Sequence, residues 1–207
     1  MNRGLFLGVI AMATIVVASN ILVQFLLGSW LTWGAFTYPF AFLVTDLMNR
    51  AYGAQQARKV VLVGFIVGVI CSLIGTQIML EFGPAVSLRI ALGSGVAFLV
   101  AQLTDVAVFN RLRAASWWRA PLVSSFIGSA LDTALFFSIA FAGAFVFLDV
   151  SQPNGWAREV VPMFGFGPAA PLWLSLALAD FAVKMSLALV ALGPYRLALS
   201  RLTPARA

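Results

Sequence analysis

The 207-residue sequence contains no histidine and a single cysteine, Cys71. The lack of histidine excludes a Ser-His-Asp triad, a Cys-His pair and the usual zinc sites. One cysteine cannot form a disulfide within the chain. We expect no catalytic residues, no metal ligands and no cofactor, and a protein that is not an enzyme.

Charged residues are also scarce, at 10% of the chain, whereas 62% of the residues are apolar and the mean hydropathy is +0.99. Soluble domains carry about 25% charged residues, so this composition excludes a soluble enzyme, a secreted disulfide scaffold and a disordered chain. The natural solvent for such a surface is lipid. The net charge of +6 is explained by the Lys and Arg that membrane proteins collect on their cytoplasmic side, and nucleic acid is not an expected partner.

Six apolar runs follow one another along the chain, and a membrane-spanning helix needs about 20 such residues. The first run could resemble a signal peptide, but it continues well past that point without a polar cleavage region, so we expect a retained span. The sequence thus predicts an all-α, polytopic membrane protein with six transmembrane helices in a single integral-membrane domain, residues 1–207. The expected spans are residues 5–27, 33–49, 60–80, 86–110, 122–148 and 171–193.

The distribution of Lys and Arg between the loops predicts the orientation. If the N-terminus is cytoplasmic, ten basic residues lie on the cytoplasmic side and two, Arg89 and Arg158, lie outside. Such a bias in short loops indicates that both termini are cytoplasmic. The ten are Arg3, Arg50, Arg58, Lys59, Arg111, Arg113, Arg119, Arg196, Arg201 and Arg206.

Two segments depart from regular helices. From Pro39 to Arg50 the second span provides only about 16 Å of helix, and a residue before proline, here Tyr38, is disfavoured in the helical region. We expect this span to be irregular or broken, either bent at Tyr38-Pro39 or entered as a re-entrant stretch from Trp30. The outer loop, residues 149–168, is rich in Pro and Gly and is either a cap over a site or a plain connector.

Five ionisable residues lie within the predicted spans: Asp46, Asp105, Asp132, Asp180 and Lys184. Each costs roughly 2.5–3.5 kcal/mol at the bilayer centre, so it must face the bundle interior, find a partner or line a wet cavity. Asp180 and Lys184 are four residues apart and share a helix face. They form either a self-neutralising pair that permits insertion or part of a binding site.

Further polar residues share helix faces with one another. Ser125, Gly128 and Asp132 do so in the fifth span, Gln102 and Asp105 in the fourth, and Asn20 and Gln24 in the first. Each amide either joins two helices by a hydrogen bond or contacts a substrate. Asp46 and Arg50 are expected to form a gating or structural ion pair at the inner end of the second span.

A series of short strings in this order resembles the YhhQ-type queuosine precursor transporters, also called the vitamin uptake transporter family. The strings cover nearly the whole chain: SNILVQ from Ser19, TWGAF from Thr32, PFAFLVTDL from Pro39, QLTDV from Gln102, VFNRLR from Val108 and WWRAP from Trp117, followed by Asp132-Thr133, Asp180, Lys184 and Pro194-Tyr195.

The resemblance implies an importer of 7-deazaguanine bases in the bacterial inner membrane, which supplies queuosine salvage in tRNA. A carboxylate can accept from N1–H and the exocyclic amine of such a base, an amide or Lys can donate to its carbonyl, and aromatic rings can stack on it. The expected partners are thus a nucleobase-like small molecule and the bilayer, and a homodimer is left open. The candidate substrate-binding residues are Asn20, Gln24, Phe36, Phe40, Gln102, Asp105, Asp132, Phe136, Asp180 and Lys184.

Three other functions compete with this one. A substrate-capture subunit of a vitamin importer would also be small and six-helical, and it would rely on ATPase partners because this chain has no Gly-x-x-x-x-Gly-Lys loop. An intramembrane enzyme could use two neighbouring carboxyl groups, such as Asp105 and Asp132. A purely structural membrane protein is the third alternative.

Overall fold

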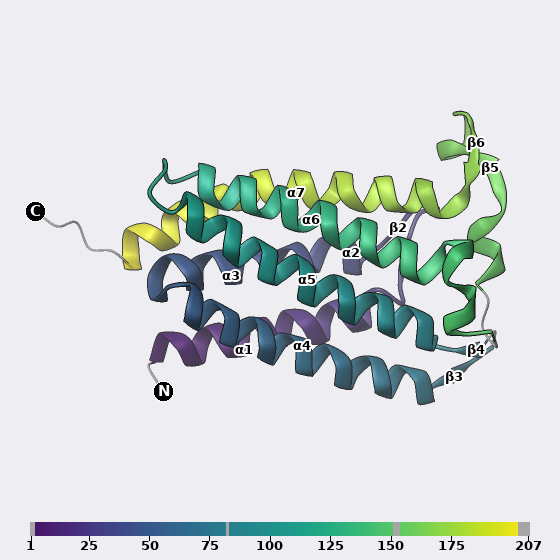
Figure 1. Cartoon of the computed structure of the whole chain (residues 1–207), viewed down its shortest axis with the longest axis horizontal. Coiled ribbons are helices and arrows are strands. Elements are labelled where there is room, and N and C mark those ends of the chain that lie inside the picture. The colour runs from purple at the N-terminus through teal and green to yellow at the C-terminus, as the bar shows by residue number, and fades with distance from the viewer. Residues whose placement is uncertain (1–2, 82, 151–153, 203–207) are drawn as a thin grey trace, which may run out of the picture.

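The computed structural model describes residues 3–81, 83–150 and 154–202. Arg206, which the orientation argument counted, lies outside these residues. The described chain forms a bundle of roughly antiparallel helices, shown in Figure 1. The helices are α1 (Arg3–Leu22), α2 (Gly34–Thr37), α3 (Pro39–Tyr52), α4 (Ala54–Gln77), α5 (Leu88–Leu112), α6 (Arg119–Phe141) and α7 (Leu172–Leu202).

Five of these helices, α1, α4, α5, α6 and α7, are long and apolar enough to cross a membrane by length and composition. The polytopic all-α class predicted from the sequence is thereby supported. The second expected span is divided into α2 and α3, which together run from Gly34 to Tyr52, about 28 Å of helix at 1.5 Å per residue.

The backbone at this division is more regular than predicted. Tyr38 has helical dihedrals (φ −57°, ψ −41°), so the expectation that the residue before Pro39 leaves the helical region was wrong. Its backbone N–H still bonds to the carbonyl of Gly34 at 3.1 Å. The interruption is local because Pro39 has no N–H to continue the ladder.

Several helix ends also differ from the predicted spans. The first helix ends at Leu22, and Gln24 lies in the turn that follows, so Asn20 and Gln24 do not share a helix face. The fifth span ends at Phe141 instead of continuing to residue 148. The residues that follow form a short 3-10 helix, Gly143–Leu148. The last helix continues past residue 193 with Pro194 inside it. Hydropathy cannot locate these ends, because apolar residues continue into the turns.

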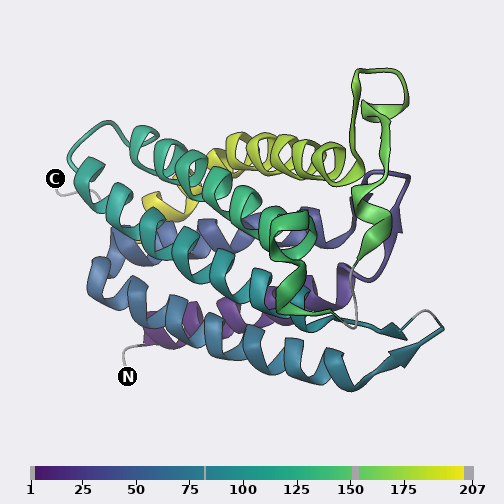
Figure 2. The same cartoon turned by 45° about the vertical axis from the view of Figure 1, so that its right-hand side comes forward.

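Short antiparallel hairpins connect the helices at one end of the bundle (Figures 1 and 2). They are β1 (Leu26–Leu27) with β2 (Leu31–Thr32), β3 (Met79–Leu80) with β4 (Gly83–Pro84), and β5 (Val160–Pro162) with β6 (Ala169–Pro171). Two further 3-10 helices, Gly155–Arg158 and Met163–Gly165, lie in the long loop between α6 and α7. The loop contacts the first hairpin region, because the ring centroids of Phe164 and Trp30 lie 5.7 Å apart.

The opposite end of the bundle is the basic end, where α1 begins, α3 meets α4, α5 meets α6 and α7 ends (Figure 1). Arg3, Arg58, Lys59, Arg111 and Arg119 belong to these helix ends. The described chain thus starts and finishes at the same end of the bundle.

At the hairpin end a buried arginine joins α5 to α6. Arg89 is completely buried, its Nε donates to the carbonyl of Ile139 at 2.7 Å, and one Nη donates to the carbonyl of Ala142. Cations are favourable at helix C-termini, where the last carbonyls lack partners. This contact holds the start of α5 against the end of α6.

A close helix crossing occurs at Gly128 of α6. A Cβ atom built there would lie 2.7 Å from a ring carbon of Phe42 on α3, and 3.4 Å from the carbonyl oxygen of Ala101 and from Cβ of Asp105 on α5. Small residues permit such approaches between membrane helices. Gly128 is therefore where α3, α5 and α6 meet.

We expect Gly128→Val to destabilise the protein by about 1–3 kcal/mol, the usual cost of overpacking a filled interior. Thermal unfolding in detergent would measure the loss. Gly193→Val is the matched control, because a Cβ atom at Gly193 meets no atom within 4 Å. Equal unfolding temperatures for the two variants would show that the crossing at Gly128 is loose.

Candidate functional site

A buried ion cluster joins the middle of α6 to the middle of α7. Lys184 Nζ lies 2.6 Å from Oδ2 of Asp132 and 2.5 Å from Oδ2 of Asp180. Lys184 is only 4% exposed and Asp132 only 5%. The pair of Asp180 and Lys184 expected from their spacing is thus present, but a third residue, Asp132, shares the ammonium.

Two neutral hydroxyl groups complete this cluster. Tyr38, between α2 and α3, donates its hydroxyl to Oδ1 of Asp132 at 2.9 Å, and Thr133 donates to Oδ2 of Asp180 at 2.8 Å. Lys184 Nζ also lies 5.3 Å from the centre of the Tyr38 ring, in cation–π range. With two carboxylates and one ammonium, the cluster carries an excess of one negative charge when all three are ionised.

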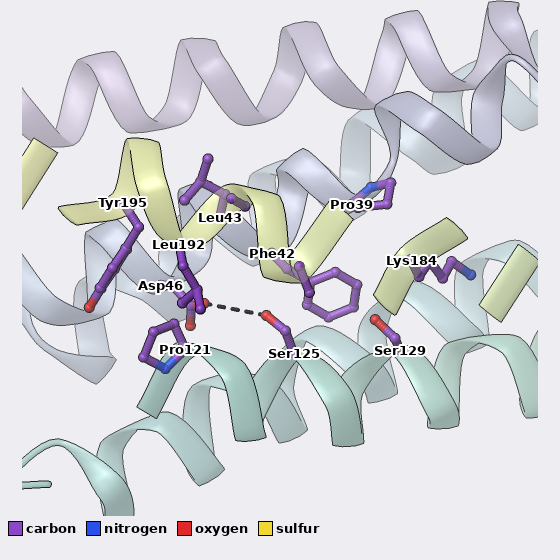
Figure 3. A pocket seen from close by; sticks show the side chains of 12 residues that line it. Pro39, Phe42, Leu43, Asp46, Pro121, Ser125, Ser129, Lys184, Leu192 and Tyr195 are labelled. Atoms are coloured by element: carbon purple, nitrogen blue, oxygen red, sulfur yellow. Dashed lines mark hydrogen bonds between the residues drawn. The ribbon is translucent and has the colours of Figure 1, made fainter. Parts of the chain in front are cut away.

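A cleft runs from this cluster toward the basic end, between α3, α6 and α7. It holds about 350 Å³ of space not filled by protein atoms, counting the part that opens to the surroundings. Figure 3 shows Lys184 and Ser129 at one end of the cleft, Tyr195 and Pro121 at the other, and Asp46 and Ser125 between them. The cleft thus extends from Lys184 of the ion cluster to Asp46, and neither Asp132 nor Asp180 lines it.

The Asp46 carboxyl accepts hydrogen bonds from two serines of α6, Ser124 at 3.2 Å and Ser125 at 3.4 Å. It also contacts the carboxyl group of Asp105 on α5. The competing enzymatic hypothesis paired Asp105 with Asp132. The structure instead places Asp105 with Asp46 and Asp132 with Lys184.

Arg50 does not form the predicted ion pair with Asp46. Its Nε donates to the hydroxyl of Tyr195 at 3.1 Å, its Nη1 donates to the carbonyl of Arg113 at 2.8 Å, and Arg113 Nη2 donates to the carbonyl of Arg50 at 2.6 Å. The guanidinium also lies 5.1 Å from the ring centre of Phe109. Arg50 thus links α3 to α7 and to the end of α5, because a hydroxyl and a carbonyl there accept from its guanidinium, while two serines of α6 donate to Asp46.

Gln102, the other polar candidate on α5, faces α3. It accepts a hydrogen bond from Thr45 at 2.7 Å, while its own amide nitrogen is buried and has no partner among the described residues. Gln102 is completely buried and does not line the cleft. Of the two roles expected for this amide, the structure shows the hydrogen bond between two helices.

The remaining candidates do not meet the ion cluster. Asn20 donates to the carbonyl of Val16 within its own helix, and Gln24 is exposed. Phe40 is 42% exposed. Phe36 packs beside Trp33, and Phe136 belongs to an aromatic cluster with Phe137 and Phe141 toward the hairpin end.

Sequence reasoning did not select Thr133, Ser129 or Tyr195 as site residues, and it considered Tyr38 as the residue at which the second span bends. Thr133 could have been selected from the sequence, because it is adjacent to Asp132. No sequence signal connected Tyr38 with Asp132, which lie 94 residues apart in the chain. Their contact depends on how α3 and α6 pack.

Comparison with known proteins gives a consistent assignment. A family model described as "Putative vitamin uptake transporter" matches residues 32–198. The chain is 34% identical over 191 residues to "Queuosine precursor transporter" of Escherichia coli, covering 85% of this chain and 77% of that protein.

Two more relatives agree. "Probable queuosine precursor transporter" of Haemophilus influenzae is 45% identical over 122 residues, 53% of this chain and 52% of that protein. The protein of the same name from Bacillus subtilis is 26% identical over 198 residues, 86% of this chain and 76% of that protein. No solved structure matches the chain. The family match over most of the chain and the relatives of similar length show that this protein belongs to the vitamin uptake transporter family, a family of membrane transporters.

Proposed function

We propose that this protein imports queuosine precursors across the bacterial inner membrane for queuosine salvage in tRNA. Its substrates are 7-deazaguanine bases such as 7-cyano- and 7-aminomethyl-7-deazaguanine. The names of the relatives point to this substrate class. The observation that carries the proposal is the buried cluster of Asp132, Asp180 and Lys184 at the end of the cleft.

The chemistry of the cluster suits such a base. A carboxylate of Asp132 or Asp180 can accept from the N1–H and the exocyclic amine together, and Lys184 can donate to the carbonyl oxygen. The excess negative charge also suits a positively charged aminomethyl substituent. For a base to bind, it must replace part of the bonding between Lys184 and the carboxylates. Substrate entry therefore loosens the contact between α6 and α7.

The test is complementation in bacterial cells that neither synthesise these precursors nor possess their own importer. Expression of this protein should restore queuosine in tRNA when a 7-deazaguanine base is added to the medium, whereas an empty vector should not. Direct uptake of a tritiated base would confirm that transport is the cause. Absence of both signals, with the protein present in the membrane, would overturn the proposal.

The competing capture-subunit hypothesis predicts a different result in a purified system. A transporter that works alone moves the base into liposomes that contain only this protein. A capture subunit binds the base there but does not move it until ATPase partners are added.

The proposed orientation makes a separate prediction. In the structure the helix ends that carry most basic residues gather at one end of the bundle, and an excess of Lys and Arg marks the cytoplasmic side. A reporter fused after Ala207 should therefore be active only if it functions in the cytoplasm. Activity of a periplasmic reporter at this position would reverse the topology.

A further inference from the structure

The carboxyl groups of Asp46 on α3 and Asp105 on α5 contact each other in the interior of the bundle. Asp46 is 2% exposed and Asp105 is completely buried. Ser124 and Ser125 donate to Asp46, but neither oxygen of Asp105 has a hydrogen-bond donor among the described residues. Asp105 therefore lies beside the Asp46 carboxyl group and the Ser124 hydroxyl, and no cation of the described residues lies with them.

No cation neutralises this pair in the part of the chain that the structure describes. The buried basic groups of α3 and α7 bond elsewhere: Lys184 bonds to Asp132 and Asp180, and Arg50 bonds through Nε and Nη1 to Tyr195 and the Arg113 carbonyl, while its Nη2 has no partner among the described residues. On α4, Arg58 and Lys59 are exposed. From α6 the pair meets serines, and from α7 the neutral hydroxyl of Tyr195 lines the same cleft.

Two carboxylates that touch in a low-dielectric interior cannot both remain charged without a counter-ion, because their repulsion adds to the cost of burying each charge. One proton held between them removes the repulsion and supplies the missing donor to an oxygen of Asp105. Close acidic pairs in proteins share a proton in this way. The pair is thus built to hold one proton.

We propose that Asp46 and Asp105 form the coupling site of the transporter, which binds one proton and releases it in each cycle so that the proton gradient drives uptake. This inference rests on the proposed function. No covalent bond between heavy atoms changes: one proton enters the pair from the outer side and leaves to the cytoplasm with each base.

The geometry connects this proton site to the substrate site through two helices. Asp46 follows Tyr38 on the divided second span, and Tyr38 donates to Asp132. On α6, Ser125 bonds to Asp46 while Asp132 bonds to Lys184. When the proton leaves, repulsion between the carboxylates separates α3 from α5 and alters the contacts of α3 with α6. The bond between Tyr38 and Asp132 responds, and the affinity for the base changes.

Asp46 is the member of the pair that borders open space. It lines the cleft that extends to Tyr195 near the basic end, whereas Asp105 lies behind it and does not line the cleft. A proton of Asp105 is therefore exchanged through Asp46.

The first experiment detects the proton without a substrate. Infrared spectra of the full chain in nanodiscs at neutral pH should show the C=O band of a protonated carboxyl group. The band should persist in Glu159→Gln, a surface carboxylate control, and in Asp105→Glu, which keeps the acid. It should disappear in Asp46→Asn/Asp105→Asn. A band that survives in this double variant, or its absence from the wild type, would overturn the proton site.

The second experiment measures coupling in proteoliposomes with tritiated 7-aminomethyl-7-deazaguanine and the membrane potential held at zero. A gradient of one pH unit, acidic outside, supports about tenfold accumulation by the wild type for one proton per base. Asp105→Asn should exchange labelled for unlabelled base but accumulate none. Accumulation by this variant, or accumulation driven only by a sodium gradient, would contradict the inference. If the wild type does not even exchange the base, the proposed substrate is wrong, and the infrared result still decides whether the pair holds a proton.

Discussion

Asp132→Asn is expected to lower uptake of a 7-deazaguanine base by about 10–150-fold while the protein still inserts into the membrane. Asparagine keeps the shape of the side chain but replaces one acceptor oxygen with a donor, so it cannot accept from N1–H and the amine together. A hydrogen bond to a charged group contributes about 1.5–3 kcal/mol, which corresponds to this loss of affinity. The substitution also removes one of the two carboxylates that hold Lys184.

Initial uptake rates, normalised to the amount of protein in the membrane, would measure this effect. Glu159→Gln is the matched control, because it makes the same chemical change at an exposed position outside the helices. Uptake by Asp132→Asn at the level of the control would show that Asp132 has a structural role only.

Lys184→Met is expected to produce the largest loss of stability of any single substitution in the cluster. It leaves Asp132 and Asp180 facing each other without the ammonium that both contact. Removing one partner of a buried ion pair costs about 3–5 kcal/mol. The unfolding temperature in detergent and the amount of folded protein in the membrane should both fall.

The double variant Asp180→Asn/Lys184→Met tests whether Asp180 and Lys184 serve only the insertion of α7 into the membrane or also bind the substrate. It should recover part of the stability lost in Lys184→Met, because only Asp132 remains charged and Tyr38 still donates to it. We expect no transport, since both the donor for the carbonyl and one carboxylate are missing. Near-normal transport by the double variant would mean that Asp180 and Lys184 serve only to insert α7.

The candidate site was predictable where it depended on one helix. A spacing of four residues places Asp180 and Lys184 on one face, and the structure joins them. The same rule failed for Asp46 and Arg50, because Arg50 has better partners on α5 and α7. It also failed for Asn20 and Gln24, because α1 ends before Gln24.

By itself the sequence determined that this is a polytopic helical membrane protein of a transporter family, and that a few carboxyl groups had to be buried. Composition and apolar runs determine these properties locally, because a segment that crosses lipid must be apolar and must satisfy its backbone hydrogen bonds internally. Only the tertiary structure decided which acid meets the lysine and which meets another acid. Asp132 and Asp105 both lie in apolar helices with similar neighbours. The packing of α6 against α7 gives the first an ammonium, and the packing of α3 against α5 gives the second a carboxyl group. That difference separates the proposed substrate site from the proposed proton site.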